Sequence, residues 1–433
     1  MARFVLLLTA LGIISLAACQ RMPDIELART CRSVLPAINP PGARVDVLST
    51  SAVGETAIEV VYSAHARDAP PRQRRLTCTF APSEWASGRL PEIETLISDG
   101  ERIGPVRIAL LRRFWLSTPE GTAADPAPYI LLWPLPELAP WVAAGLQQFV
   151  SALPMISIYA LLAPAYALVY GLIGRINLAF GEFAAVAAYG ALLGTAIASG
   201  WGMAAPALLA LTLGLWSAAV HGLAASRLIF SHLSRSSGQH ALIATIGLAL
   251  ALQEYLRLFQ GSALRWVAPV LNQPVALAKS DAFVVTLTPM ATIVTGLALA
   301  AATALLLTMQ RSRFGRLWRA CADDRSAAML VGVDPDAVLS RTFVLACVMA
   351  GLAGVIVTGF YGGLGYAGGI VLGLKSLIAA VAGGIGSVPG AFLGGILIGG
   401  AEALWSALFP IEYRDVAIYS LLAALLIWRP GGL

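Results

Sequence analysis

The sequence predicts an all-α polytopic membrane protein with eight or nine transmembrane helices, preceded by a small exported α+β domain. Two observations lead to this fold class. Of the 433 residues, 58% are hydrophobic and only 12% are charged, whereas a soluble domain carries roughly 25% charged residues. The charges are also uneven, because residues 20–145 hold 27 of them and residues 146–433 hold 25. The chain therefore joins a modest polar domain to a long apolar body that has lipid as its solvent.

Residues 1–19 have the composition of a secretory signal peptide. Arg3 precedes an apolar run that ends in small residues before Cys19, and the run is too short for a comfortable membrane span. Its end also resembles a bacterial lipoprotein box, in which Cys19 would be lipidated. The alternative is an uncleaved signal anchor with an incidental cysteine. In both cases the segment that follows is exported.

Residues 20–118 form the predicted α+β domain, on the periplasmic side of the membrane. Helical spacing or strand alternation marks its elements. The predicted helices cover residues 25–38 and 91–116, and the predicted strands cover 43–48, 56–63 and 75–80. The charges of the domain balance and His65 stands alone, so we expect no catalytic or metal site there. A proline-rich linker follows at residues 119–145.

Cys31 and Cys78 are the two cysteines within this domain. Export would place them in an oxidising compartment, where one disulfide could hold a small domain together. The alternative is a pair of buried free thiols.

The body of the chain, residues 146–433, contains nine apolar stretches. Most approach the roughly 20 residues that a helix needs to cross a bilayer. They cover residues 148–172, 178–198, 203–229, 241–260, 284–309, 341–362, 371–388, 391–409 and 414–428. The stretch at 371–388 is the uncertain one, because its glycines could make it re-entrant.

Two clusters of basic residues predict the orientation of this body. Residues 227–240 and 310–319 are rich in arginine, so both should face the cytoplasm. Counting spans backwards from either cluster places residue 147 outside, which agrees with the signal peptide. The net charge of +5 is therefore explained by cytoplasmic loops and not by nucleic-acid binding.

Ionisable residues within apolar spans are costly in lipid and are candidates for a translocation pathway. Asn177, Gly181 and Glu182 interrupt an apolar run in the stretch IGRINLAFGEF. A broken helix is tolerated in a membrane where protein or a water-filled cavity satisfies its backbone. The alternative is an ordinary cytoplasmic hairpin in which Glu182 caps a helix.

Five more polar residues lie in predicted spans. Gln253 belongs to the sequence QEYLR, in which Glu254 and Arg257 could pair at a spacing of three; snorkelling to the interface is the alternative for this group. Lys375 and Glu402 are lone charges in apolar surroundings. Each could line a pathway or hold helices together.

A polar amphipathic stretch, residues 319–341, follows the second basic cluster. Its spacing predicts a short helix, a tight turn at Gly332 and the cap of the next helix. Such a surface could dock a soluble partner or could be a simple loop. The sequence contains no P-loop, GxSxG, HExxH or paired CxxC motif, so we expect no nucleotide hydrolysis, catalytic residue, metal or cofactor in this chain.

From about residue 146 to its end the chain resembles the branched-chain amino-acid ABC transporter permease family, specifically its LivH-like half. Four blocks in the order and spacing of the family carry the resemblance. They are YALVYGLIGRINLAFGEFAAVAAYGA, ALIATIGLALALQEYLRLFQG, RACADDRSAAMLVGVDPDAVLSRTFVLACVMAGLAGVI and GLKSLIAAVAGGIGSVPGAFLGGILIGGAEAL.

The resemblance implies an inner-membrane, pore-forming subunit with several partners. They are a second permease, two cytoplasmic ABC ATPases and a periplasmic solute-binding protein. It also implies a coupling loop for the ATPase and supports the pathway role of the stretch around Glu182. The implied coupling residues are Asp324, Ala327, Ala328 and Gly332.

This chain departs from the family pattern in three places. Phe180 stands where family members commonly have histidine, Arg175 stands where an apolar residue is usual, and about 145 residues precede the first span. Urea-type relatives can carry such extensions, so a urea or short-amide substrate is an alternative. A membrane-anchored sensor or structural protein is the alternative outside transport. A membrane enzyme is disfavoured, because no cluster of catalytic or metal-binding residues is present.

Overall fold

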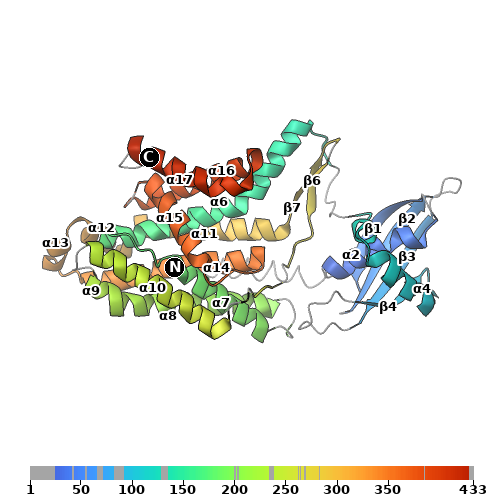
Figure 1. Cartoon of the computed structure of the whole chain (residues 1–433), viewed down its shortest axis with the longest axis horizontal. Coiled ribbons are helices and arrows are strands. Elements are labelled where there is room, and N and C mark those ends of the chain that lie inside the picture. Colours follow the sequence, from blue (N-terminus) through green and yellow to red (C-terminus); the bar gives the residue numbers. More distant parts are fainter. Residues whose placement is uncertain are drawn as a thin grey trace. The chain divides into compact units, whose positions relative to one another are not determined.

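The computed structural model divides the chain into two compact units, residues 1–135 with 271–276, and residues 136–270 with 277–433 (Figure 1). It describes residues 25–40, 43–53, 56–65, 72–81, 92–127, 135–198, 201, 204–233, 238–261, 263, 265–267, 270–281, 283–384 and 386–428. The predicted signal peptide and Cys19 lie outside the described residues.

The first unit is built on a five-stranded antiparallel sheet in which each strand pairs with the next along the chain. The strands are β1 (Arg44–Ala52), β2 (Ala57–His65), β3 (Arg72–Phe80), β4 (Ile93–Ser98) and β5 (Glu101–Arg102). In β2, Ile58, Val60 and Tyr62 are buried while their neighbours are more exposed. Buried and exposed side chains thus alternate along the strand. This alternation favours a strand, because successive side chains point to opposite faces of a sheet and one face becomes apolar. The helices α2 (Ile25–Ser33) and α3 (Leu35–Ile38) add apolar residues to the same core.

The predicted helix over residues 91–116 is wrong in its first part. Ile93–Ser98 forms β4 and pairs with β3, and Asp99 and Gly100 then turn the chain with φ angles of +52° and +88°. Helix begins only at Pro105, with α4 (Pro105–Leu111) continuing as the π-helical η1 (Arg112–Leu116). The spacing of Ile93 and Leu96 suits a helix, but the open edge of β3 supplies backbone partners that a local pattern does not reveal.

The predicted linker contains helix at both ends. The short α5 (Pro119–Ala123) begins it, and the first span, α6 (Pro140–Ile173), starts within it. Proline at the first helical position explains both starts, because it lacks the N–H that a first-turn residue leaves unpaired.

The second unit is a bundle of apolar helices, and each of the nine predicted apolar stretches contains one. They are α6, α7 (Glu182–Ile197), α8 (Ala204–Ala225), α10 (Gly238–Gln260), α11 (Pro289–Arg311), α14 (Pro335–Tyr361), α15 (Gly368–Ala382), α16 (Val388–Leu408) and α17 (Arg414–Trp428). The span that contains α8 continues through the π-helical η2 (Ser226–Phe230), and the short α9 (Ser231–Leu233) follows.

Six of these helices are long and apolar enough to cross a membrane. Among the described residues, α7 and α15 are apolar but have only 16 and 15 residues. The predicted count of eight or nine spans is therefore not confirmed. The predicted span at 284–309 also begins later, because residues 284–287 form β7 (Val284–Leu287), which pairs with β6 (Val275–Lys279).

Helix α6 lies at the centre of the bundle and packs against α11, α14, α15 and α16. Small residues set the close approach of neighbouring helices. A Cβ added at Gly354 of α14 would collide with the backbone of Ala184 in α7. Helices in lipid associate through such close packing, because the lipid removes the hydrophobic drive that acts in water.

Candidate functional site

Glu182 is the first residue of α7, and its side chain is fully buried. Its Oε1 accepts a 2.8 Å hydrogen bond from Nε2 of Gln253 in α10. Its Oε2 has no hydrogen-bond partner within the part of the chain that the structure describes. Leaving a buried polar atom unpaired costs about 1–3 kcal/mol. This oxygen therefore keeps an unused capacity to accept a hydrogen bond.

The start of α7 lies deep in the bundle rather than at one of its ends. Gln253, the partner of Glu182, lies about 22 Å along α10 from Gly238 at a rise of 1.5 Å per residue. Helix α6 ends at Gly174, which has φ +66°. Residues 175–181 therefore run back into the bundle, as a broken stretch and not as a hairpin at the surface. Irregular backbone at this depth needs polar partners from the protein or a water-filled cavity.

Asn177 organises this broken stretch. Its backbone N–H donates to the hydroxyl of Tyr166 at 3.0 Å, and its Oδ1 accepts from the N–H of Ala179 at 3.1 Å. Its Nδ2 is buried and has no partner among the described residues. Nη1 of Arg175 is likewise buried without a partner in the described part of the chain. The break thus holds unused donors at Arg175 and Asn177 and an unused acceptor at Glu182.

Gly181 allows α15 to approach the break at backbone distance. An added Cβ there would collide with the carbonyl oxygen of Gly369 and the backbone nitrogen of Gly373. An added Cβ at Gly369 would in turn lie 2.6 Å from Oε2 of Glu182. The two α15 glycines are four residues apart, the spacing at which a helix presents a groove for close packing. The backbone of α15 therefore forms one wall beside the Glu182 carboxylate.

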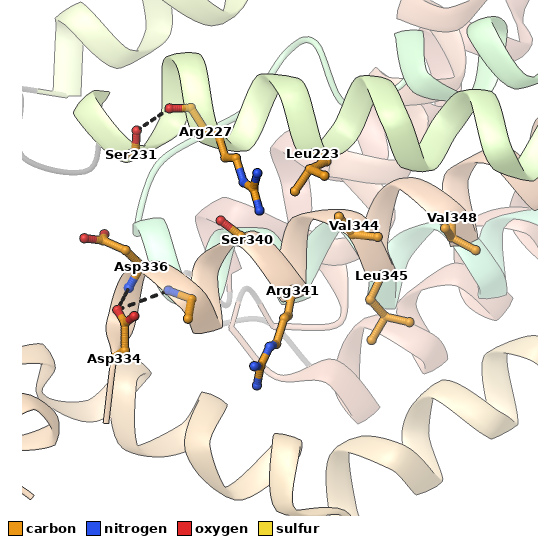
Figure 2. Close-up of a pocket in the computed structure, with 11 residues that line it drawn as sticks. Leu223, Arg227, Ser231, Asp334, Asp336, Ser340, Arg341, Val344, Leu345 and Val348 are labelled. Carbon is orange, nitrogen blue, oxygen red and sulfur yellow. Dashed lines mark hydrogen bonds between the residues drawn. The ribbon is translucent and has the colours of Figure 1, made fainter. Parts of the chain in front are cut away.

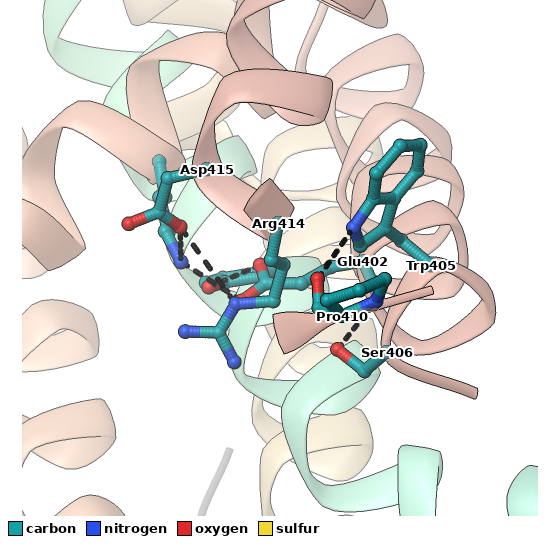
Figure 3. Close-up of polar contacts among 8 residues, drawn as sticks. Glu402, Trp405, Ser406, Pro410, Arg414 and Asp415 are labelled. Carbon is teal, nitrogen blue, oxygen red and sulfur yellow. Dashed lines mark hydrogen bonds and ion pairs between the residues drawn. The ribbon is translucent and has the colours of Figure 1, made fainter. Parts of the chain in front are cut away.

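Lys375 and Glu402 form a second, separate group. The Lys375 Nζ lies 2.8 Å from Oε1 of Glu402 and 3.0 Å from Oδ1 of Asp415. The hydroxyl of Tyr159 donates to Oε2 of Glu402 at 2.8 Å, and Arg414 Nε lies 3.1 Å from Oε1 of the same carboxylate. In Figure 3 the side chains of Arg414 and Asp415, from the start of α17, reach toward Glu402 on α16. Two cations and two anions balance one another here, so the group ties α6, α15, α16 and α17 together.

Gln253 separates from its sequence neighbours in the structure. Glu254 and Arg257 form the expected pair, with the Arg257 Nε donating to Glu254 at 2.7 Å, and both are exposed. Gln253 instead turns toward Glu182. One short motif therefore serves two faces of α10.

The predicted coupling segment is a helix–turn–helix between α11 and α14. It contains α12 (Arg313–Asp323) and α13 (Arg325–Leu330). Asp324 caps α13 by accepting from the N–H groups of Ser326 and Ala327 at 2.7 and 3.0 Å. Ala328 is buried, Ala327 is exposed, and Gly332 has φ +83°. The positive φ explains glycine at 332, because other residues rarely adopt it.

The tip of this segment exposes apolar side chains. Leu330 and Val331 are 88% and 77% exposed. An ion pair of 2.6 Å between Arg325 and Asp336 joins α13 to α14. An exposed apolar tip held by this ion pair is suited to contact with a partner.

An open pocket of about 730 Å³ lies beside this segment, between the α8–η2 helix and α14. Figure 2 shows Arg227 extending from the upper helix toward Ser340 on α14, while Asp334 holds the first turn of α14. The rest of its wall is formed by Leu223, Ser231, Asp336, Ala337, Arg341, Val344, Leu345 and Val348. The pocket is thus part of the same end of the bundle as the coupling segment.

Cys31 and Cys78 are joined by a disulfide in the first unit, with their Cα atoms 5.9 Å apart. Cys31 lies in α2 and Cys78 in β3, so the bond links helix to sheet inside the core.

Sequence reasoning missed the residues that complete both groups. Tyr159 and Tyr166 look like ordinary apolar positions in a long span, and nothing in the sequence marks them. Arg414 and Asp415 are adjacent opposite charges directly before the last apolar stretch. That position could have indicated that they serve a buried charge.

Comparison with known proteins is consistent with this architecture. Residues 148–427 match the family described as the branched-chain amino acid transport system permease component. The chain is 36% identical over 294 residues to the high-affinity branched-chain amino acid transport system permease protein LivH of Escherichia coli K12, covering 66% of this chain and 94% of that protein. It is 34% identical over 291 residues to the corresponding protein BraD of Pseudomonas aeruginosa, covering 66% of this chain and 95% of BraD.

Proposed function

Because the chain belongs to the branched-chain amino acid transport permease family, we propose that it is the pore-forming subunit of an ABC importer that carries branched-chain amino acids across the inner membrane. It is a transport subunit and not a catalytic enzyme. The observation that carries the proposal is the buried Glu182 carboxylate, with an unused oxygen, inside the region that matches the family.

The broken stretch offers chemistry that suits an amino-acid zwitterion. The Oε2 atom of Glu182 would accept from the ammonium group, and the Nδ2 atom of Asn177 would donate to the carboxylate. Gln253 would hold the Glu182 carboxylate in place through its 2.8 Å hydrogen bond. Gly181 and Gly369, which have no side chains, would hold α15 close beside this carboxylate.

Lys375 and Glu402 enter the proposal in a different role. Their group is internally balanced, so it supports the pathway by holding α17 against α15 and α16. A buried ion pair of this kind serves specific packing more than net stability.

The proposed assembly contains a second permease, two cytoplasmic ABC ATPases and a periplasmic solute-binding protein. In the proposed orientation the basic segments 227–240 and 310–319 would face the cytoplasm and the first unit would lie in the periplasm. The exposed tip at Leu330 and Val331, held by the caps at Asp324 and Asp334, would then meet an ATPase. Motion of the ATPase would reach the bundle through α13 and α14.

The test is uptake of labelled solutes into proteoliposomes that contain the complete assembly and the binding protein. Leucine, isoleucine and valine should be taken up in an ATP-dependent manner, and unlabelled urea should not compete. Uptake of urea or acetamide in place of leucine would identify the amide substrate class. ATP-independent behaviour, or failure to assemble with any ATPase, would contradict the transport role.

A further inference from the structure

The helix formed by α4 and η1 in the first unit carries an exposed apolar row. Val106, Leu110 and Phe114 recur every four residues and are 73%, 52% and 66% exposed. Residues at this spacing lie on one face of a helix. A row of three large apolar side chains on a small polar domain indicates a surface that is covered by something else.

The opposite face of the same helix fixes its orientation. Ile108 and Leu111 are buried in the core of the first unit. Trp115 packs against that core, and its indole N–H donates to the carbonyl oxygen of Ser33 at 2.7 Å. The helix therefore has two apolar faces. One packs against the core of the domain, and the other faces outward.

The charged side chains of this helix are all positive. Residues 105–116 contain three arginines and no acidic residue. Arg112 pairs with Glu92, whereas Arg107 and Arg113 are exposed and have no ion-pair partner within the described part of the chain. They lie on either side of the apolar row at helical spacing, so guanidinium groups flank Leu110 and Phe114.

The length of chain that joins this helix to the membrane limits how far it can be from lipid. Helix α6 begins at Pro140, 24 residues after Leu116. A fully extended chain of that length spans at most about 80 Å. Because the helix is tethered within this distance of α6, its binding to the surface that α6 enters would be an intramolecular step, with an effective concentration set by the linker.

We propose that α4–η1 lies on the surface of the bilayer that α6 enters, with its outward face bound to anionic phospholipid. Val106, Leu110 and Phe114 reach the boundary between headgroups and acyl chains, and Arg107 and Arg113 contact lipid phosphates. An apolar row flanked by arginines is the pattern of an interfacial helix, and each basic residue near an anionic surface adds binding. A soluble acidic protein or a second copy of this chain would cover the row without requiring lipid.

The test uses the full chain in nanodiscs, with Phe114 replaced by the photo-crosslinking residue p-benzoylphenylalanine. The matched control carries the same residue in place of Leu48, which is 58% exposed on β1 of the same unit. In nanodiscs that contain phosphatidylglycerol, mass spectrometry should find lipid adducts at 114 in several-fold excess over those at 48. The excess should fall several-fold in pure phosphatidylcholine, or when Arg107→Gln and Arg113→Gln are added.

Three outcomes would overturn the proposal. Equal lipid adducts at 114 and 48 would mean that the unit meets lipid without a preferred face. If the yield of lipid adducts did not depend on phosphatidylglycerol or on Arg107 and Arg113, anionic lipid would not be what the arginines bind. Adducts to protein at 114 would assign the row to a protein partner or a second copy. The intact disulfide and an unchanged unfolding temperature would show that each variant is folded.

Discussion

Glu182, Lys375 and Glu402 are ionisable side chains buried among apolar helices, but they differ in how their polar atoms are satisfied. The Glu182 carboxylate keeps one oxygen without a partner. Lys375 and Glu402 are paired with each other and with neighbours of opposite charge. The unpaired oxygen of Glu182 can still accept a hydrogen bond. The charges of Lys375 and Glu402 are already neutralised by contacts that join helices.

Glu182→Gln should reduce leucine uptake roughly tenfold or more, because a charge-assisted hydrogen bond contributes about 1.5–3 kcal/mol. Glutamine has nearly the same shape and can still accept from Gln253, so folding should be preserved. The measurement is initial uptake in proteoliposomes, normalised to inserted protein. Glu254→Gln is the matched control, since its pair with Arg257 is exposed, and it should stay within about twofold. Equal effects of the two substitutions would remove Glu182 from the pathway.

Lys375→Met should lower the stability of the bundle by about 3 kcal/mol, because it leaves the buried Glu402 with less compensating charge. The double substitution Lys375→Met with Glu402→Leu should be more stable than Lys375→Met alone. Arg414 and Asp415, whose charged groups lie 3.7 Å apart, can then compensate each other. Thermal unfolding of the purified protein in detergent measures this. If the two substitutions were simply additive, the group would not act as one network.

At the scale of elements, the break between α6 and α7 and its contact with α15 decide where the site lies. The break is held by the Asn177 turn and by the backbone contact of Gly181 with α15. Neither the Asn177 turn nor the Gly181 contact depends on charge. Small residues therefore fix the backbone around the few polar atoms of the site.

Gly181→Ala should destabilise the protein by about 1–3 kcal/mol and impair uptake, because the new methyl group overpacks against the α15 backbone. Gly247→Ala is the matched control. Gly247 lies within α10 with no atom within 4 Å of an added Cβ, and alanine favours helix there by up to about 1 kcal/mol. Unfolding temperature and uptake should therefore fall only for residue 181. Similar behaviour of both variants would mean that α15 does not pack on the break as described.

Leu330→Asp should weaken co-purification of the ATPase subunits by thirtyfold or so, since a buried apolar anchor contributes about 2 kcal/mol to an interface. Leu48→Asp makes the same change at an exposed leucine in the other unit and should leave binding unchanged. Normal binding and ATP-driven uptake by the Leu330 variant would place the coupling surface elsewhere.

At the scale of the whole molecule, two units of different composition are stabilised by different means. The bundle relies on small residues and close packing in lipid. The first unit has a small core of its own, and a small core leaves little net stability. A disulfide between Cys31 and Cys78 would therefore matter most in that unit.

Removing this disulfide with Cys31→Ala and Cys78→Ala should cost the first unit about 3–4 kcal/mol, as expected for closing a loop across a separation of 47 residues. Before mutation, the intact mass with and without reductant should differ by two hydrogens. Alkylation of both thiols in the absence of reductant would show that the bond does not form in the cell.

The sequence alone determined the division into a polar unit and an apolar body, the approximate place of each apolar helix and the resemblance to the permease family. Low charge density, helical periodicity and motif order are local properties, and local properties can be read along a chain. They also marked Glu182, Gln253, Lys375 and Glu402, because a charge or an amide in an apolar run is conspicuous.

Only the tertiary structure decided which of these residues meet. Gln253 reaches Glu182 across 71 residues, and Tyr159 reaches Glu402 across 243. It also decided that residues 93–98 are a strand and that α7 starts inside the bundle. The physical reason is the same in each case. A buried polar atom must be satisfied by whatever the fold brings near it, and those neighbours are set by packing between distant segments, which no local pattern records.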